Sequence, residues 1–400
     1  MLLCEAPRPT ATHARILLLA LAGWTFDFYD LILYTFLVRP ISHDLGLTDM
    51  DHALALGISF GATAVGGIAS GFAADRFGRR TVVTWTILLY SAGSLASGLA
   101  VNKAMLLLAR AVTGVGVGGE WAAGHALVAE TFPPAHRGRA GAILQTGAPI
   151  GVGLATLVGT FVVPHASWRA ILVASSATAL IAFAARRGMP ESDLWQRGGA
   201  RPLGAGLSQL LGSRVFWLAL VLTTVNGASY WLTYSWMPEY LRRRGLSLAA
   251  SGSYMATIVV GEIIGYSIFG FVSDRIGRRP AFTLFALLMA AGLLPLTVLW
   301  SHFSPLAIQA ATALVGIGTG TWSNFGPLLA ELFPTERRNA GMGIVFNTSR
   351  AVQFGAPVLI AALEPRYGLA AGIALAAAFA VAASGLVWTL PETRGQTLVA

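Results

Sequence analysis

The sequence predicts an all-α membrane protein with twelve transmembrane helices in two pseudo-symmetric six-helix bundles. Of its residues, 55% are hydrophobic and 11% are charged, whereas ordinary soluble domains contain about 25% charged residues. The apolar residues form runs of roughly 20, long enough to cross about 30 Å of hydrocarbon. A charged loop that occurs twice, about half a chain apart, indicates two similar halves.

The repeat is carried by three pairs of short segments. Residues 71–80 read GFAADRFGRR and residues 270–279 read GFVSDRIGRR, and each copy joins one apolar run to the next. Two parallel membrane repeats, with a site at their interface near the bilayer midplane, are typical of secondary transporters. Two further pairs have nearly the same offset, namely ETFP at 130–133 with ELFP at 331–334 and PES at 190–192 with PET at 391–393.

Hydropathy gives the expected boundaries. We expect an N-terminal six-helix bundle at 1–186, a cytoplasmic linker at 187–213 and a C-terminal six-helix bundle at 214–400. The linker is placed where prolines, glycines and charges interrupt the apolar pattern. The spans are expected at 15–38, 53–74, 81–100, 104–129, 139–163 and 167–186, and at 214–238, 249–273, 280–300, 304–331, 339–363 and 367–390.

The charges in the loops predict the orientation. With the N-terminus inside, the cytoplasmic loops hold roughly 18 arginines and the outer loops about 6 basic residues, so the positive-inside rule places both termini in the cytoplasm. We therefore expect a multi-pass protein of the cell inner (plasma) membrane. Its first apolar run has no small-residue cleavage site and is expected to be retained. The outer run Arg242, Arg243 and Arg244 departs from the rule. We interpret it as the solvated face of a loop, and the alternative is a cluster that attracts anions to the outer entrance of the transporter.

Several classes of protein are excluded. The net charge of +9 comes from basic residues scattered in short loops, so no nucleic-acid partner is expected. Cys4 is the only cysteine, which excludes an intramolecular disulfide and a cysteine-based metal site. No nucleophile–base arrangement and no phosphate-binding Walker loop is found, so we expect no enzyme, no cofactor and no metal.

A glycine-rich stretch imitates a nucleotide-binding motif. Residues 114–119 read GVGVGG, which satisfies the G-x-G-x-x-G pattern but lies inside an apolar span instead of between a strand and a helix. Gly316, Gly318 and Gly320 repeat it in the second half. We therefore interpret these glycines as contacts between closely packed helices.

Ionisable residues within spans are costly unless they are paired or hydrated, so each is a functional candidate. Asp27 and Asp30 share one helix face, where a carboxyl group in a low dielectric can take up a proton. Arg110 is the expected partner of one of them, and a permanent aspartate–arginine pair remains the alternative. The candidates for proton coupling are Asp27, Asp30, Arg110, Glu120 and Glu262.

A second set of polar and aromatic residues is expected to line a substrate site. Arg350 carries a permanently charged guanidinium that binds a carboxylate in a fork geometry. It shares a helix face with Asn347, and the expected seventh helix presents a stripe of polar and aromatic residues at spacings of four. The predicted substrate-binding residues are Arg350, Asn347, Asn226, Tyr230, Tyr234, Gln145, Gln353, Trp322, Asn324 and His125.

The repeated loop resembles the signature G-x-x-x-D-R-x-G-R-R of the major facilitator superfamily, and both copies match it fully. The resemblance covers essentially the whole chain. It implies two bundles that rock around a central cavity, with the loop as a conformational latch rather than a substrate site. The residues assigned to the latch are Gly71, Asp75, Arg76, Arg79, Glu130 and Arg137, with Gly270, Asp274, Arg275, Arg278, Glu331 and Arg337 as their counterparts.

The branch of the family is indicated by three segments. Residues 23–30 read GWTFDFYD and resemble the sialate, lactate and pyruvate:proton symporters, as does PESDLW at 190–195. GEW at 119–121 resembles the metabolite:proton symporter branch more broadly. Tyr29 and Leu31 depart from that pattern. The resemblance implies a monomeric symporter that takes up a small organic anion, such as a monocarboxylate or a sugar or aromatic acid, with a proton. A sugar or polyol:proton symporter is the main alternative and a drug-efflux antiporter the next, and Arg350 favours the anion. Beyond that anion and the proton, membrane lipid is the expected partner.

Overall fold

The computed structural model describes residues 3–186, 189–199, 202, 204, 206–234, 236–353 and 355–398. In this part of the chain every regular element is a helix. The helices of the first half are α1 (Ala11–Leu45), α2 (Asp49–Phe77), α3 (Arg79–Gly98), α4 (Lys103–Thr131), α5 (Arg137–Gln145), α6 (Gly147–Phe161) and α7 (Trp168–Arg186), and the short α8 (Asp193–Gly198) and α9 (Leu207–Leu211) follow.

The second half repeats this order with three differences, the first of which is that its first span is divided into two helices, Arg214–Tyr234 and Met237–Arg243. The span expected at 304–331 is divided by the short 3-10 helix η4 (Thr319–Thr321). The last two expected spans run together through a kink at Gly368, which has φ 76° and ψ 160°. The helices are α10 (Arg214–Tyr234), α11 (Met237–Arg243), α12 (Leu248–Ile276), α13 (Arg278–Thr297), α14 (Pro305–Gly318), α15 (Trp322–Leu332), α16 (Arg338–Gln353) and α17 (Gly355–Leu386). Each predicted span therefore coincides with one helix or with a broken or kinked pair.

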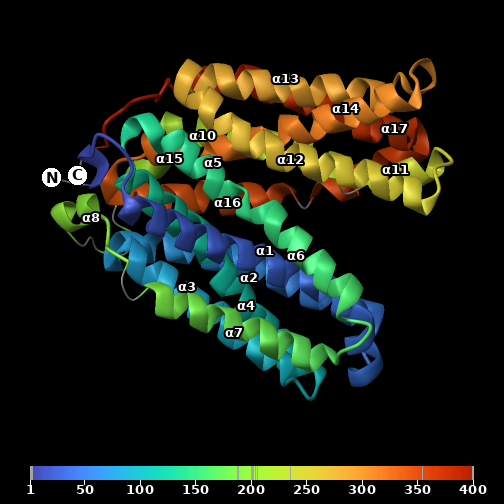
Figure 1. Cartoon of the computed structure of the whole chain (residues 1–400), viewed down its shortest axis with the longest axis horizontal. Coiled ribbons are helices and arrows are strands. Elements are labelled where there is room, and N and C mark those ends of the chain that lie inside the picture. Colours follow the sequence, from blue (N-terminus) through green and yellow to red (C-terminus); the bar gives the residue numbers. More distant parts are fainter. Residues whose placement is uncertain are drawn as a thin grey trace.

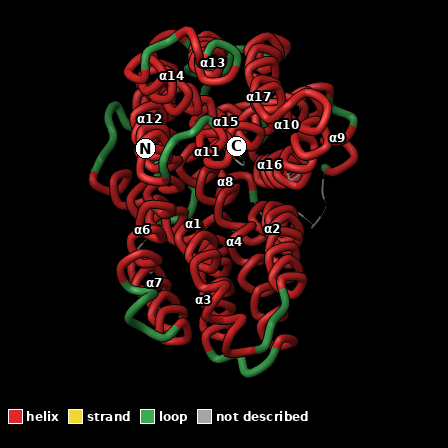
Figure 2. Tube along the Cα trace, turned by 90° about the vertical axis from the view of Figure 1, so that its right-hand side faces the viewer, coloured by secondary structure: helices red, strands yellow, loops and turns green. Residues whose placement is uncertain are grey.

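Figure 1 shows the helices in two groups, one from each half of the chain. The groups meet at the end where both termini lie and spread apart at the other end. We call the first the closed end and the second the open end. Helices from different halves pack together along the seam, α5 against α12 and α2 against α16. Figure 2 shows the second of these pairs side by side.

The repeated loops turn the chain tightly at the closed end. Gly78 between α2 and α3 has φ 97°, and Gly277 between α12 and α13 has φ 106°. Both values lie in the left-handed region, which residues with a Cβ rarely adopt. The glycine of each loop copy is therefore required by the backbone where a long helix ends and the next begins.

The glycine-rich stretch of α4 allows three helices to pack closely. A Cβ atom added to Gly118 would lie 2.0 Å from the carbonyl oxygen of Thr63 on α2, and one added to Gly116 would lie 2.4 Å from the amide nitrogen of Tyr90 on α3. In the second half, a Cβ atom on Gly316 would lie 2.2 Å from the carbonyl oxygen of Ile258 on α12. These contacts confirm the packing interpretation of the motif.

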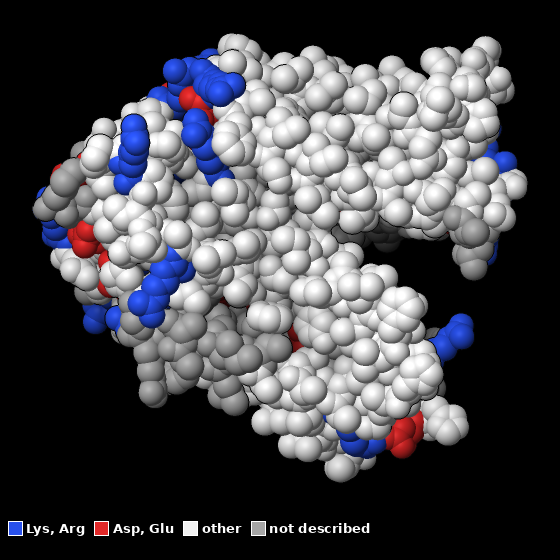
Figure 3. Space-filling model, in the orientation of Figure 1, with Lys and Arg blue, Asp and Glu red and all other residues white. Residues whose placement is uncertain are grey.

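Among the described residues, the ion pairs at the open end each stay within one half of the molecule. Lys103 of α4 pairs with Asp51 of α2, Arg169 of α7 with Asp44 of α1, and Arg243 of α11 with Glu364 of α17. The other two arginines of the outer run are also engaged, since Arg242 binds Glu239 at 2.5 Å and the guanidinium of Arg244 lies 5.1 Å from the ring centre of Tyr240. Figure 3 shows most of the charges of this face gathered at the closed end, and a hollow between the two halves at the open end.

Candidate functional site

A cavity of about 320 Å³ lies between the two halves. Its wall is mostly apolar and aromatic, and Arg350 of α16 and Glu262 of α12 are the two charged residues among its described lining residues. The remaining lining residues are Trp24, Phe28, Leu31, Ile32, Thr35, Phe60, Gln145, Ala148, Pro149, Val152, Tyr230, Trp231, Tyr234, Met255, Val259, Tyr266, Trp322 and Phe346.

Half of the predicted substrate-binding residues line this cavity. Arg350 lies with its guanidinium carbon 5.8 Å from the ring centre of Phe346. Tyr230 and Tyr234 stack with ring centres 4.1 Å apart at 13°, and their hydroxyl groups donate to the two carboxylate oxygens of Glu262, each at 3.4 Å. Trp322 and Gln145 also reach the wall.

Four other predicted substrate residues lie elsewhere, and the expectation that they line this cavity is corrected. Asn347 faces a small neighbouring void and donates to the carbonyl oxygen of Gly343 at 2.9 Å. Asn226 and Asn324 are buried away from the wall. Residues spaced by four drift about 40° per step around a helix, so Asn226 is turned about 80° from Tyr234. The ring of His125 packs beside Gly326.

Beside the cavity, His125 belongs to a group of contacting side chains that connects the two halves. Its Nε2 lies 3.1 Å from Oε1 of Gln145, which also accepts a hydrogen bond from the indole of Trp121 at 3.3 Å. Trp121 of α4 stacks on Phe346 of α16, with ring centres 3.6 Å apart at 6°. The side chain of Gln353, the remaining predicted substrate residue, lies outside the described part of the structure.

The two aspartates of α1 face different arginines. Asp30 forms a buried ion pair with Arg110 at 3.3 Å and accepts a hydrogen bond from Ser94 at 2.7 Å. Arg110 also donates to Ser97 and Thr113 at 3.0 and 3.2 Å. Asp27 is fully buried and interacts electrostatically with Arg350. The partner of Arg110, which the sequence left open, is therefore Asp30.

Glu120 lies away from the cavity. It is buried between α3 and α4 and accepts a hydrogen bond from Thr86 at 3.2 Å. This geometry favours the contact between neighbouring helices over a direct role in proton coupling. Glu262, the other open candidate, lines the cavity.

At the closed end, a carboxylate from each half caps a helix of the other half. Asp75 at the end of α2 accepts hydrogen bonds from the backbone N–H groups of Asn339 and Ala340, at 3.3 and 2.9 Å, in the first turn of α16. Asp274 of α12 accepts from those of Gly138 and Arg139, both at 3.0 Å, in the first turn of α5. A carboxylate at a helix N-terminus is stabilised by the free N–H groups and the helix dipole.

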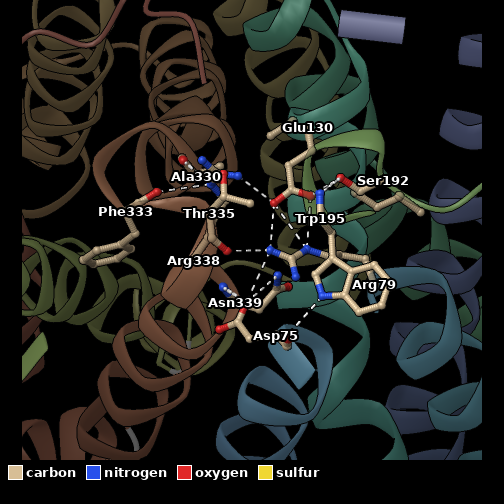
Figure 4. Close-up of polar contacts among 12 residues, drawn as sticks. Asp75, Arg79, Glu130, Ser192, Trp195, Ala330, Phe333, Thr335, Arg338 and Asn339 are labelled. Atoms are coloured by element: carbon tan, nitrogen blue, oxygen red, sulfur yellow. Dashed lines mark hydrogen bonds and ion pairs between the residues drawn. The ribbon is translucent and has the colours of Figure 1, made fainter. Parts of the chain in front are cut away.

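Two buried glutamates each bind arginines from both halves. Figure 4 shows the contacts of the first, Glu130. Glu130 pairs with Arg79 at 2.9 Å and with Arg338 of the second half at 2.6 Å. Its counterpart Glu331 pairs with Arg278 at 2.8 Å and, across the seam, with Arg137 at 3.3 Å. Removing one partner from such a buried group leaves a charge uncompensated.

Gly71 and Gly270 lie on the seam itself. A Cβ atom on Gly71 would lie 2.6 Å from the carbonyl oxygen of Asn339, and one on Gly270 would lie 2.8 Å from the Cα atom of Arg139. Each glycine therefore permits a close approach of helices from different halves.

Three predicted latch arginines are placed differently from the others. Arg338, not Arg337, is the counterpart of Arg137, because each lies seven residues after its glutamate. Arg337 instead donates to Gln209. Arg76 and Arg275 are exposed, since helical spacing turns them away from the aspartates that precede them. The sequence carried this signal, because counting seven residues from each glutamate gives Arg137 and Arg338.

The PES and PET segments, which served above only as markers of the repeat, contribute residues to the polar contacts at the closed end. Glu191 accepts from the backbone N–H groups of Arg79 and Arg80, both at 3.1 Å, at the start of α3. Burial raises the pKa of the Glu191 carboxyl group. Ser192 donates to Glu130, which is thereby linked to the segment after the first bundle.

The second copy has the same geometry. Glu392 accepts from the N–H groups of Arg278 and Arg279 at 2.8 and 3.0 Å, and Thr393 donates to Glu331 at 2.6 Å. Burial alone would raise the pKa of Glu392, but these backbone donors outweigh it and hold the pKa below its usual range. The sequence could have indicated these contacts, because in both segments a Glu is followed by Ser or Thr, which places a hydrogen-bond acceptor next to a donor.

Comparisons with known proteins agree with this architecture. The Major Facilitator Superfamily profile matches residues 17–266 and 249–399. The chain is 31% identical over 388 residues to the "Probable 4-methylmuconolactone transporter" of Cupriavidus pinatubonensis, which covers 94% of this chain and 89% of the relative. It is 27% identical over 357 residues to the sialic acid transporter NanX of Escherichia coli, covering 87% and 86%. The structure of the proton:xylose symporter XylE matches with a TM-score of 0.79 at 18% identity, over 97% and 98% of the two chains.

The chain is thus a multi-pass membrane transporter and not an enzyme. It belongs to the Major Facilitator Superfamily, and its curated relatives are metabolite transporters. The all-α fold with twelve transmembrane helices in two pseudo-symmetric bundles, expected from the sequence, is confirmed.

Proposed function

We propose that this transporter is a proton-coupled symporter that imports a small organic anion by alternating access. The observation that carries the proposal is the position of Arg350, whose guanidinium lines an otherwise mostly apolar cavity between the halves. In such surroundings a charge-assisted contact to a carboxylate is stronger than in water. A neutral sugar offers that guanidinium no opposite charge, whereas a carboxylate does, which favours an acid as the substrate.

The relatives support an acid of moderate size. One is named as a transporter of sialic acid and another as a transporter of a muconolactone. The aromatic wall, with the stacked Tyr230 and Tyr234 and the nearby Trp322, fits a planar or ring-shaped body attached to the carboxylate. We therefore favour a monocarboxylate or a sugar or aromatic acid.

The proposed proton coupling rests on two opposite charges from different halves, Asp27 and Arg350. When Asp27 is ionised, it competes with the substrate carboxylate for Arg350, with which it interacts electrostatically. A proton on Asp27 removes the competing charge and leaves the guanidinium to the substrate. Asp30 is a less suitable carrier because its charge is already matched by Arg110.

The closed end supplies the conformational part of the proposal. Residues 1–186 and 214–400 form the two rocking bundles and 187–213 the linker, with both termini in the cytoplasm of the inner membrane. The contacts of Asp75, Glu130 and their counterparts join the bundles in this outward-facing state. They have to separate for the substrate to leave on the other side.

The test is uptake by the purified monomer in liposomes, with labelled monocarboxylates, sugar acids, aromatic acids and neutral sugars. We expect an inward proton gradient to drive accumulation of at least one acid and of no neutral sugar. Arg350→Lys should weaken the affinity for the best acid about tenfold, since a bidentate charged contact contributes about 1.5–3 kcal/mol. Accumulation of a neutral sugar alone, or an unchanged affinity in Arg350→Lys, would contradict the proposal.

A further inference from the structure

Arg350 and Glu262 give the cavity wall two charges of opposite sign. Both come from the second half, Arg350 from α16 and Glu262 from α12. If Arg350 holds the substrate carboxylate, a function remains to be assigned to the acid on the same wall. The transport cycle proposed above does not use it.

Glu262 is surrounded by tyrosines and not by cations. Its side chain is buried, and in the described part of the chain it forms no ion pair. Tyr230 and Tyr234 donate to its two oxygens at 3.4 Å, and Tyr266 of the same helix lines the same cavity. Bonds between hydroxyl groups and carboxylates usually measure about 2.5–2.7 Å. The tyrosine contacts are therefore long, and the carboxylate can still accept a shorter, stronger hydrogen bond.

The wall around this carboxylate is geometrically well defined. Tyr230 and Tyr234 stack at 13°, and Trp322 meets Tyr230 edge-on at 5.9 Å and 87°. Stacked rings lose few rotamers when a ligand binds, so they hold the Glu262 oxygens at a fixed place in the cavity. An acceptor held in this way selects among ligands by where they carry a donor.

We propose that Glu262 and its tyrosines form a second recognition pole, which accepts a hydrogen bond from a hydroxyl or N–H group of the substrate. The proposal rests on the proposed function, in which Arg350 holds the carboxylate, and it narrows the substrate to a monocarboxylate with a distal hydrogen-bond donor. Because like charges repel strongly in an apolar site, the same pole excludes dicarboxylates. A site built to bond a hydroxyl group also rejects the analogue that lacks it, since its own polar group then stays poorly satisfied.

The test uses five related acids with the purified protein: benzoate, 3- and 4-hydroxybenzoate, and the dicarboxylates isophthalate and terephthalate. Affinity is measured by titration calorimetry, and accumulation by pH-gradient-driven uptake in liposomes. For the wild type we expect one hydroxybenzoate to bind at least tenfold more tightly than benzoate, and both dicarboxylates to bind more weakly than benzoate. Binding of none of the five overturns both the substrate class and the pole.

Glu262→Gln keeps the size of the side chain and removes its charge. We expect it to lose most of the hydroxyl preference, to admit the dicarboxylates at least tenfold better and to retain proton-driven accumulation. Glu239→Gln, the same change at the open-end surface on α11, should keep the order of affinities of the wild type. Glu262→Asp, which retracts the carboxylate by one methylene, serves if Glu262→Gln fails to fold, and it should exclude dicarboxylates but lose hydroxyl preference.

Two results would overturn the proposal while leaving the proposed function intact. In the first, Glu262→Gln keeps both the hydroxyl preference and the exclusion of dicarboxylates. In the second, it keeps all affinities but abolishes accumulation, which would make Glu262 the proton carrier. Failure of the wild type to accumulate any acid with a proton gradient would instead contradict the proposed function itself.

Discussion

Asp27 and Asp30, about one helical turn apart on α1, interact with different arginines. Asp30 faces α3 and α4 of its own half, where Arg110, Ser94 and their neighbours satisfy it. Asp27 interacts electrostatically with Arg350 of the other half. Residues three apart lie about 60° from each other around a helix, which is enough to divide them between the interior of one bundle and the seam.

Asp27→Asn should uncouple transport. Asparagine keeps the shape of the side chain, but it is uncharged and takes up no proton, so Arg350 stays available to the substrate at every pH. We expect accumulation driven by a proton gradient to disappear, whereas counterflow exchange of labelled substrate persists. Counterflow and gradient-driven uptake in the same liposome preparation separate the two effects. Full accumulation by this variant would assign the proton to another acid.

Asp30→Asn should mainly reduce stability. The change leaves the buried guanidinium of Arg110 without its counter-charge, and breaking one side of a buried pair costs about 3–5 kcal/mol. Thermal unfolding in detergent should show a clear decrease in Tm. The double variant Asp30→Asn with Arg110→Gln should recover much of the loss. An equal or larger loss in the double variant would show that the pair itself is not what matters.

The sequence predicted the list of buried charges better than their pairing. Hydropathy alone placed Asp27, Asp30, Arg110 and Arg350 within spans, because charges are rare in such runs. Which acid pairs with which arginine depends on how α1 is rotated about its axis against its neighbours, and this rotation cannot be read from a single sequence. Asn226 was misplaced for the same reason, since its stripe drifts around α10.

At the scale of elements, the closed end is built from helix ends. Two aspartates cap helices of the opposite half, and two glutamates bind arginines from both halves. The repeat in the sequence predicted these elements because the charges recur at one offset. From the sequence, Arg137 was nevertheless paired with Arg337, which lies six residues after Glu331, although Arg137 lies seven residues after Glu130 and Arg338 seven after Glu331.

Arg338→Gln and Arg337→Gln form a matched pair for the latch. Arg338 is buried and binds Glu130 across the seam at 2.6 Å, whereas Arg337 is partly exposed. We expect Arg338→Gln to open the closed end and to change the rate of exchange between states, with little change in the affinity for the substrate. Arg337→Gln should behave like the wild type. Accessibility of single cysteines at the closed end to a water-soluble maleimide gives the comparison, and equal effects of both changes would contradict the assignment.

At the scale of the whole molecule, the ion pairs differ between the two ends. At the open end, the pairs of Lys103, Arg169 and Arg243 remain within one half, whereas at the closed end Arg137 and Arg338 join the two halves. Opening the closed end therefore requires that cross-half pairs break, and no equivalent set holds the open end in the described structure. This asymmetry agrees with the hollow that Figure 3 shows between the two halves at the open end.

The most direct test of alternating access measures one distance at each end by pulsed electron paramagnetic resonance. Cys4 is the only cysteine, so Cys4→Ser gives a background for spin labels. One pair replaces the exposed Phe77 and Ile276 at the closed end, and the other replaces Val101 and Phe303 at the open end. We predict that Asp75→Asn lengthens the first distance and shortens the second, because it releases the cap on α16. A change at one end only, or no change at either, would contradict the account.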